Sequence, residues 1–494
     1  MGSQQSTPRS PTASALKREI VSEKPSLVTH DDEHTTATSG FDVLSTDILD
    51  KWSKDFDNNP VLALSRLVLS KGDPVLSLAS RSALIRDAKI FNLQLKGTGP
   101  HGEYPGPRVN QASSGRCWLF ATTNVLRYNV IEQLKLGDFE LSQNYLFFYD
   151  KLEKANYYLE NILELLDEPL DGRLLSYLNQ APVNDGGQWD MAVNIIEKYG
   201  IIPKSLYPEA FSSTASGKLD SLLTSKLREY AVLLRAAASR SKDAEYLRKL
   251  KAQFIAEVYS TLTIALGSPP KPNQQLTWEY YDRDEKFHSW TGSPNEFYEQ
   301  YGKRKGMDPK DSFSIINDPR NEYNKLYSVE RLGNVWKGNP VRYVNAPISA
   351  LEDAVISGIK ANTPIFFGCD VGKASNTPEG VMDCDVYDLK AAYGFDLGMN
   401  KAQRLETGES SMTHAMVITA VHLDASGRPL RYKVENSWSD SAGEKGWFMM
   451  TAAWFQEYVF QVVVPKSIVH KKWSDILNSE QVLLKPWDPM GSLA

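Results

Sequence analysis

The spacing of hydrophobic positions changes near residue 340, from a helical to a strand-like period. The clearest helical stretch is an apolar-rich run from Cys117 to about Leu136, which contains no proline or glycine and is followed by Gly137 as a stop signal. Beyond residue 340, short apolar runs lie between Gly, Pro, Asn or Asp residues, as strands do: 364–368, 415–421, 432–434 and 447–450. The pattern predicts an α+β protein in which a helical half faces a β-rich half.

Several other helices are predicted from spacing and capping residues. Apolar residues recur at helical spacing between residues 48 and 56, behind Ser45 as a cap, and Ser142 is placed to cap the next long helix. Another helix is expected to end at Tyr199, before Gly200. Residues 206–340 are interpreted as mostly helical and charged, with an aromatic-rich stretch at 278–301 that packs rather than binds.

The first 44 residues are rich in Ser, Thr and Pro and poor in large apolar residues, so we expect a disordered tail. Its start, Met1-Gly2-Ser3-Gln4-Gln5-Ser6, fits the short pattern for N-myristoylation. That pattern is loose, so a chance match is the favoured explanation. A Gly- and Pro-rich segment at 97–107 is expected to be an extended connection that leads to Cys117.

Composition is that of an ordinary globular protein, with 41% hydrophobic and 23% charged residues. The net charge of −6 makes the whole molecule a poor match for nucleic acid. Three cysteines are too few for a disulfide framework, and Cys369 and Cys384 lack the paired spacing of a zinc site, so no metal or cofactor is expected. No signal peptide or transmembrane run is found, and a cytoplasmic location is expected.

One local stretch departs from this balance. The stretch from Lys226 to Lys251 contains eight basic residues and only three acidic ones. A solvated helix face is the default interpretation of such a run, and a patch that binds an acidic partner or nucleic acid is the alternative.

Cys117 is the residue around which the predicted chemistry is organised. A thiol in the first turn of a helix feels the partial positive charge of that terminus, which favours the thiolate. A lone cysteine in an apolar run is by default a buried structural residue. Two later residues argue against this default, because His414 could act as the base and Asn436 could orient its ring, in the order that a thiol hydrolase needs.

Four further residues complete the candidate site. Gln111, six residues before Cys117, and the Cys117 backbone N–H are candidates for stabilising an oxyanion. Trp438 could shield the bond between His414 and Asn436 from water. The paired glycines Gly186 and Gly187 would let the backbone approach a substrate closely.

These motifs resemble those of papain and the cathepsins. Gly115, Cys117 and Trp118 match the nucleophile segment of that family, whereas Ser114 replaces its first cysteine and Arg116 replaces its small residue. The family's disulfide at this point is therefore absent. The segment Asp185-Gly186-Gly187 is similar to the family's S2 wall, and Asn436-Ser437-Trp438 is similar to the segment that carries its asparagine.

The narrower resemblance is to the bleomycin hydrolases, which are intracellular papain-like peptidases. It extends from about residue 45 to the end and includes 115–120, 184–191, 409–416 and 485–491. It implies a two-lobed papain-like fold with a large helical insertion and a C-terminal arm. The expected divisions are a tail at 1–44, a helical lobe at 45–205, the insertion at 206–340, a β-rich lobe at 341–468 and the arm at 469–494.

The resemblance also implies a homohexamer that acts as an aminopeptidase of broad specificity on peptides with a free N-terminus. The arm would lie in the cleft, where the carboxylate of Ala494 could pair with the substrate's α-ammonium. Three alternatives remain open at this point: an acyl transferase or an endopeptidase that uses the same residues, and a nucleic-acid-binding or scaffold protein on the same fold.

Overall fold

The computed structural model describes residues 44–86, 88–97, 108–241, 243–303 and 308–493. The predicted tail with its myristoylation pattern, most of the connection at 97–107, and Ala494 lie outside these residues. In the described residues no helix is long and apolar enough to cross a bilayer.

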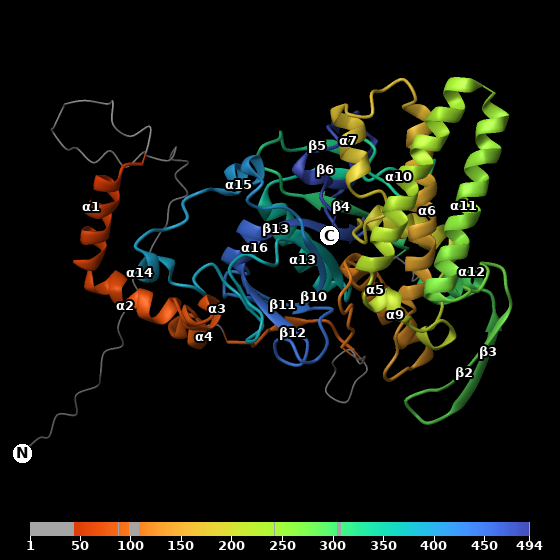
Figure 1. Ribbon diagram of the computed structural model, residues 1–494. Coiled ribbons are helices and arrows are strands. Elements are labelled where there is room, and N and C mark those ends of the chain that lie inside the picture. Colours follow the sequence, from red (N-terminus) through yellow and green to blue (C-terminus); the bar gives the residue numbers. More distant parts are fainter. Residues whose placement is uncertain (1–43, 87, 98–107, 242, 304–307, 494) are drawn as a thin grey trace, which may run out of the picture.

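The structure has one large sheet with helices packed around it and a separate hairpin of β2 and β3 (Figure 1). The helices are α1 (Thr46–Asp57), α2 (Pro60–Leu69), α3 (Pro74–Ser77), α4 (Arg81–Arg86), α5 (Cys117–Leu134), α6 (Gln143–Glu164), α7 (Arg173–Gln180), α8 (Trp189–Tyr199), α9 (Phe211–Thr214), α10 (Gly217–Arg240), α11 (Ala244–Leu266), α12 (Pro294–Phe297), α13 (Ile348–Lys360), α14 (Leu389–Tyr393), α15 (Lys401–Thr407), α16 (Ala452–Tyr458) and α17 (Lys471–Asp475). The strands are β1 (Leu93–Gln94), β2 (Leu276–Tyr281), β3 (Phe287–Gly292), β4 (Ser312–Ile316), β5 (Lys325–Val329), β6 (Tyr343–Asn345), β7 (Ile365–Cys369), β8 (Ser375–Asn376), β9 (Val381–Met382), β10 (His414–Leu423), β11 (Pro429–Glu435), β12 (Trp447–Thr451), β13 (Val459–Pro465) and β14 (Gln481–Leu484).

Local sequence signals explain where the main helices begin and end. The Ser45 hydroxyl accepts from the Ile48 N–H, and the Ser142 hydroxyl accepts from the Tyr145 N–H at 3.1 Å. Gly200 ends α8 with a φ of 77°, a conformation that favours glycine. The helices predicted behind Ser45, from Cys117, behind Ser142 and up to Tyr199 are therefore confirmed, as are the strands β7, β10, β11 and β12.

The described strands include twelve that form a single sheet in the order β14-β5-β6-β4-β13-β7-β10-β11-β12-β9-β8, with β1 paired to β10. At its centre, β10 pairs antiparallel with both β7 and β11, which aligns His414 with Cys369 and Val417 with Glu435. This register brings the start of β10 and the end of β11 to the same edge of the sheet. The side chains that follow these ends can therefore meet.

Helix α5 lies in the core against β10 and is buried continuously from Cys117 to Ile131. Other elements enclose this helix on all sides, among them the sheet, α6 and α8. The first turn of α5 is thereby fixed next to the start of β10.

The interpretation of 206–340 as mostly helical is correct only for its first part. Helices α10 and α11 pack side by side against α6, to the right in Figure 1. The aromatic-rich stretch is instead the hairpin β2–β3, where Trp278 stacks on Tyr280. Strands β4 and β5 follow and pair within the main sheet. The proposed boundaries between lobes stay a prediction.

Candidate active site

Cys117 is the first residue of α5 and is 2% exposed at the bottom of a cleft of about 670 Å³. The cleft is lined by two kinds of residues. Predicted site residues among them are Gln111, Cys117, Gly186 and His414. The others come mainly from the loop before α5, from α10 and from the segment after α7, and Leu493 near the C-terminus also contributes.

His414 and Asn436 meet as the strand register predicts. The Nε2 of His414 lies 2.9 Å from the Oδ1 of Asn436, and both side chains are buried. An amide oxygen that accepts from Nε2–H leaves Nδ1 unprotonated in the neutral ring. The Trp438 ring lies 4.8 Å from the His414 ring, tilted by 30°, and covers this pair. A shielding role of Trp438 stays a prediction.

Burial governs the charge of both reactive groups. It raises the pKa of the Cys117 thiol to about 12, although the N–H groups of Ala415, Trp118 and Cys117 act in the opposite direction. Burial likewise lowers the pKa of His414 to about 4, against the effect of its hydrogen bond to Asn436. The expectation that the helix terminus alone favours a thiolate is wrong for the resting site, because loss of solvation is the larger effect.

Gln111 is held beside Cys117 by hydrogen bonds at both ends of its amide. Its Nε2 donates to the Ser114 carbonyl at 2.6 Å, and its Oε1 accepts from the Ser437 hydroxyl at 2.6 Å. Ser437 directly follows Asn436, so one short segment fixes both Gln111 and the histidine partner. The amide NH₂ carries two donors, and one bond to Ser114 leaves the second for another acceptor.

The two glycines differ in their surroundings. Gly186 lines the cleft, and its carbonyl accepts from the Lys154 ammonium at 2.6 Å. At Gly187 a Cβ would lie 2.5 Å from the Trp118 ring, so only glycine fits there. Gly187 thus has a packing reason for its identity, and a role of either glycine in binding substrate stays a prediction.

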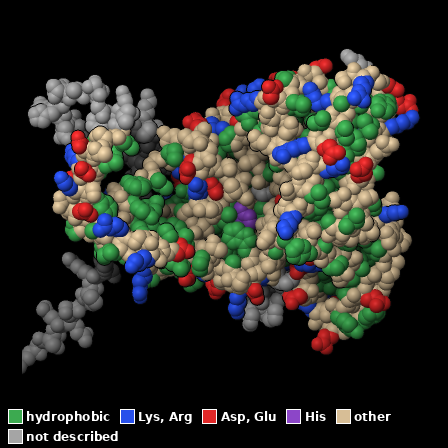
Figure 2. Space-filling model, viewed as in Figure 1, with side chains coloured by type: hydrophobic (Ala, Val, Ile, Leu, Met, Phe, Trp, Pro, Cys, Tyr) green, Lys and Arg blue, Asp and Glu red, His purple; other side chains and the backbone are tan. Residues whose placement is uncertain are grey.

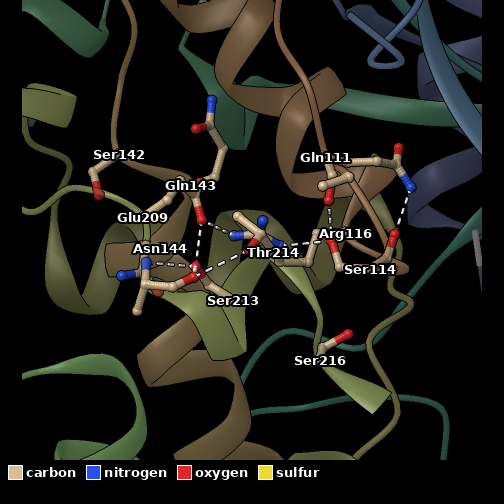
Figure 3. A network of polar contacts seen from close by, with 12 residues as sticks. Gln111, Ser114, Arg116, Ser142, Gln143, Asn144, Glu209, Ser213, Thr214 and Ser216 are labelled. Carbon is tan, nitrogen blue, oxygen red and sulfur yellow. Dashed lines mark hydrogen bonds and ion pairs between the residues drawn. The ribbon is translucent and has the colours of Figure 1, made fainter. Parts of the chain in front are cut away.

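A network around Arg116 supports the loop that precedes Cys117 (Figure 3). Arg116 is fully buried and donates to the Ser114 hydroxyl at 2.9 Å and to the Glu209 carboxylate at 2.9 Å. The Ser114 hydroxyl in turn donates to the Gln111 carbonyl at 2.6 Å, and the Ser213 hydroxyl donates to Glu209. From the sequence, Arg116 was interpreted only as a departure from the papain pattern. Its partner Glu209 lies 93 positions later, so no sequence pattern links the two residues.

A second missed group joins the loop to α6 and α10. The Asp185 carboxylate accepts from the Gly115 N–H at 2.8 Å and from the Ser216 hydroxyl at 2.5 Å, and it pairs with Lys151 at 2.7 Å. Lys151 also pairs with Asp220 at 2.5 Å. Single acidic and basic residues spread over 70 positions give no pattern in the sequence, so this group could be found only in the structure.

The C-terminal segment enters the same cleft. The Gln188 side chain donates to the Ser492 carbonyl at 2.8 Å, and the Ser492 hydroxyl donates to the Met412 carbonyl at 3.1 Å. Leu493 then lines the cleft. The predicted anchor Ala494 lies outside the described residues. Among those residues, no group of His, Cys, Asp and Glu could hold a metal ion, and all three cysteines are free.

Comparisons with known proteins identify the family of this chain. A family model described as the Peptidase C1-like family matches residues 43–491. The chain belongs to the Peptidase C1-like family. It is therefore a cysteine-type peptidase, and the papain-like fold and the resemblance to bleomycin hydrolases predicted from the sequence are confirmed.

Individual relatives cover most of the chain. Cysteine proteinase 1, mitochondrial, from Saccharomyces cerevisiae is 43% identical over 90% of this chain and 92% of its own. Aminopeptidase C from Listeria monocytogenes is 46% identical over 78% of this chain and 86% of its own. The crystal structure of PepW from Lactobacillus rhamnosis superposes with a TM-score of 0.86 at 40% identity, covering 92% of this chain and all of that one.

Proposed function

We propose that this protein is a cysteine aminopeptidase of broad specificity in which Cys117 is the nucleophile, His414 the general acid and base, and Asn436 the group that orients His414. The 2.9 Å contact between His414 and Asn436, in a cleft that also contains Cys117, is the observation that carries the proposal. Relatives named aminopeptidase C support the reaction class.

The reaction proceeds in two balanced steps. The Cys117 sulfur attacks the scissile carbonyl carbon while its proton moves to Nδ1 of His414. The imidazolium then returns this proton to the leaving amine as the C–N bond breaks and a thioester remains. Water attacks the thioester with His414 as base, which releases the carboxylic acid and restores the thiol.

The electrostatics of the site suit this sequence. Burial opposes a lone thiolate and a lone imidazolium, as the raised pKa of Cys117 and the lowered pKa of His414 show. Transfer of one proton between them creates two opposite charges together, whose attraction in a poorly solvated site offsets the loss of solvation. We infer that the second N–H of the Gln111 amide and the Cys117 N–H stabilise the oxyanion.

The C-terminal segment supports specificity for a free N-terminus. Ser492 is fixed on both sides, by Gln188 and by the Met412 carbonyl, and this directs the chain into the cleft at Leu493. A segment that occupies the cleft at Leu493 would limit how many residues a substrate can place before the scissile bond, which favours substrates with a free N-terminus. Without the segment the same cleft would suit an endopeptidase.

The alternative of a nucleic-acid-binding or scaffold protein receives little support from the basic run at 226–251. Lys226 and Lys249 pair with glutamates on their own helices, and Arg248 and Lys251 pair with Glu160. Arg228 and Arg235 donate to backbone carbonyls. Half of the eight basic residues therefore hold α10 and α11 against neighbouring elements. An acyl transferase that uses the same residues would differ only in the group that attacks the thioester, which would be an amine instead of water.

We also propose a homohexamer and a cytoplasmic location. Hydrophobic side chains gather over α1 and α2, at the left of Figure 2, and Val61, Leu64 and Leu67 are each 58–66% exposed there. An apolar face of this kind on a soluble domain is typical of a protein–protein contact. For the location, the word "mitochondrial" in the name of the yeast relative is the competing indication.

Steady-state hydrolysis of an aminoacyl fluorogenic amide with a free amine tests the proposal. We expect Cys117→Ala to reduce kcat by at least about 10³-fold, because the nucleophile is lost. Cys384→Ala is the matched control, since it removes an exposed free thiol, and should keep full activity. Comparable activity of wild type and Cys117→Ala would refute the proposed nucleophile.

A further inference from the structure

The cleft continues past Cys117 along one face of α10. Residues on this helix that line the cleft recur at helical spacing and are small or polar: Gly217, Asp220, Ser221, Thr224, Ser225 and Arg228. The opposite wall is formed by Gln180, Ala181 and the segment from Asn184 to Gly186. A substrate whose scissile carbonyl lies at Cys117 will direct a neighbouring side chain into this polar space.

Asp220 is the acidic residue on the α10 side of the cleft, and its carboxylate is partly exposed to solvent. Its side chain is 21% exposed, against 10% for Asp185 and 0% for Lys151, the lysine that both carboxylates share. Lys151 is already neutralised by Asp185, which also accepts from Gly115 and Ser216. Once Asp220 ionises, the group of three therefore carries one surplus negative charge at the cleft.

We propose that Asp220 is a specificity-determining residue that favours substrates with a cationic N-terminal side chain, such as arginine or lysine. This inference rests on the proposed aminopeptidase function, which supplies the substrate's orientation. The cationic side chain would occupy the space beside α10, with the Asp220 carboxylate as its partner and the hydroxyls of Ser221 and Thr224 as further acceptors.

The cationic side chains around this pocket are already paired with other groups. On α6, Lys151 pairs with both aspartates, and Lys154 is occupied by Asp150 and by the carbonyls of Asn184 and Gly186. At the outer end, Arg228 donates to the carbonyls of Asn179 and Gln180. Arg228 follows Asp220 by two turns of helix, about 12 Å along the axis, so the negative end of the pocket is the one near Cys117.

The charge of Asp220 depends on pH in an accessible range. Burial and the neighbouring Asp185 raise its pKa to about 7, although Lys151 acts in the opposite direction. Hydrogen bonds and Lys151 keep the pKa of Asp185 well below its usual range despite burial, so Asp185 stays ionised. The preference for a cationic side chain should consequently be weak at pH 6 and strong at pH 8.5.

The experiment compares kcat/KM for arginyl and citrullyl fluorogenic amides, which have nearly the same shape and differ in side-chain charge. Titration of Cys117, His414 or the substrate α-amine affects both substrates alike and cancels in the ratio. In wild type we expect the Arg:Cit ratio to rise about fivefold between pH 6 and pH 8.5. In Asp220→Asn we expect the ratio to stay at its low-pH value.

Glu229→Gln is the matched control, because it removes the same charge from α10 at an exposed site outside the cleft. Its ratio should follow that of wild type. A wild-type ratio that does not change with pH, or a rise that persists in Asp220→Asn, would overturn the inference. The wild-type profile decides this even if the variant does not fold. Failure of the proposed function is seen separately, as citrullyl hydrolysis that survives Cys117→Ala.

Discussion

At the scale of single residues, the site consists of the Cys117 thiol and the His414 imidazole, and burial disfavours the charged form of both. His414 is held by one amide and covered by one indole, and the pKa of its imidazole is lowered to about 4 while the thiol is neutral. An enzyme built this way gains its reactive ion pair only when both partners are present. Without the thiol, the pKa of His414 should therefore reflect burial and the hydrogen bond to Asn436 alone.

We predict that His414 in Cys117→Ala titrates near pH 4, well below the usual 6.5 of histidine. Since the folded state then binds its proton less tightly than the unfolded chain, the stability due to neutral His414 is present above pH 6.5 and is lost as the pH falls towards 4. NMR titration of the imidazole resonances would measure this, with His414→Gln in the same background to assign the signal. A pKa at or above 6.5 would contradict the account of burial.

The candidate residues of the site could be recognised from the sequence because each lies at a local boundary. Cys117 begins a helix, His414 begins a strand and Asn436 follows one. The supporting charges could not be recognised. Arg116 and Glu209, or Lys151 and Asp220, are far apart in the chain and meet only through tertiary packing.

At the scale of elements, buried ion pairs take the place of the covalent link that the papain resemblance implies at Ser114. Arg116 joins the start of α5 to the segment before α9, and Asp185 joins the same loop to α6 and α10. These contacts fix the loop that presents Gln111 and Cys117 without requiring a disulfide.

We predict that Arg116→Met lowers the free energy of unfolding by about 3 kcal/mol, because it leaves the Glu209 carboxylate without its cation in a largely buried site. Adding Glu209→Gln should restore a good part of that loss, since the uncompensated charge is removed as well. Chemical denaturation of wild type, the two single variants and the double variant measures the coupling. Additive losses in the double variant would show that the pair is not a unit.

Elements also show where sequence patterns stop being informative. Both ends of α5, the start of α6 and the end of α8 were predicted within a few residues. The strands β4 and β5 were missed inside the region interpreted as helical. Each has five residues and mixes polar with apolar ones, whereas β7, of the same length, comes from an apolar run between Pro364 and Gly368.

At the scale of the whole molecule, the exposed apolar face of α1 and α2 is the feature that a single chain leaves unexplained (Figure 2). It lies apart from the cleft, at the opposite side of the molecule from α10 and α11 (Figure 1). Association through this face would therefore leave the active site intact.

We predict that Leu64→Glu combined with Leu67→Glu lowers the mass in solution from that of an assembly towards that of the single chain. Both side chains are more than 60% exposed, so two charges there should disturb a contact between chains and not the fold. Light scattering with size-exclusion chromatography measures the mass. Leu222→Glu, at a similarly exposed position on α10, is the control and should leave the mass unchanged.

We propose that the C-terminal segment turns a papain-like cleft into an aminopeptidase. Met490 is buried, so truncation after Gly491 removes the segment in the cleft and keeps the core. The measurement is the ratio of hydrolysis rates for a free-amine aminoacyl amide and its N-acetylated twin, in the full chain and in the truncated one. We predict that the full chain cleaves only the free amine and that the truncated chain cleaves both. An undiminished preference for the free amine after truncation would contradict the claim.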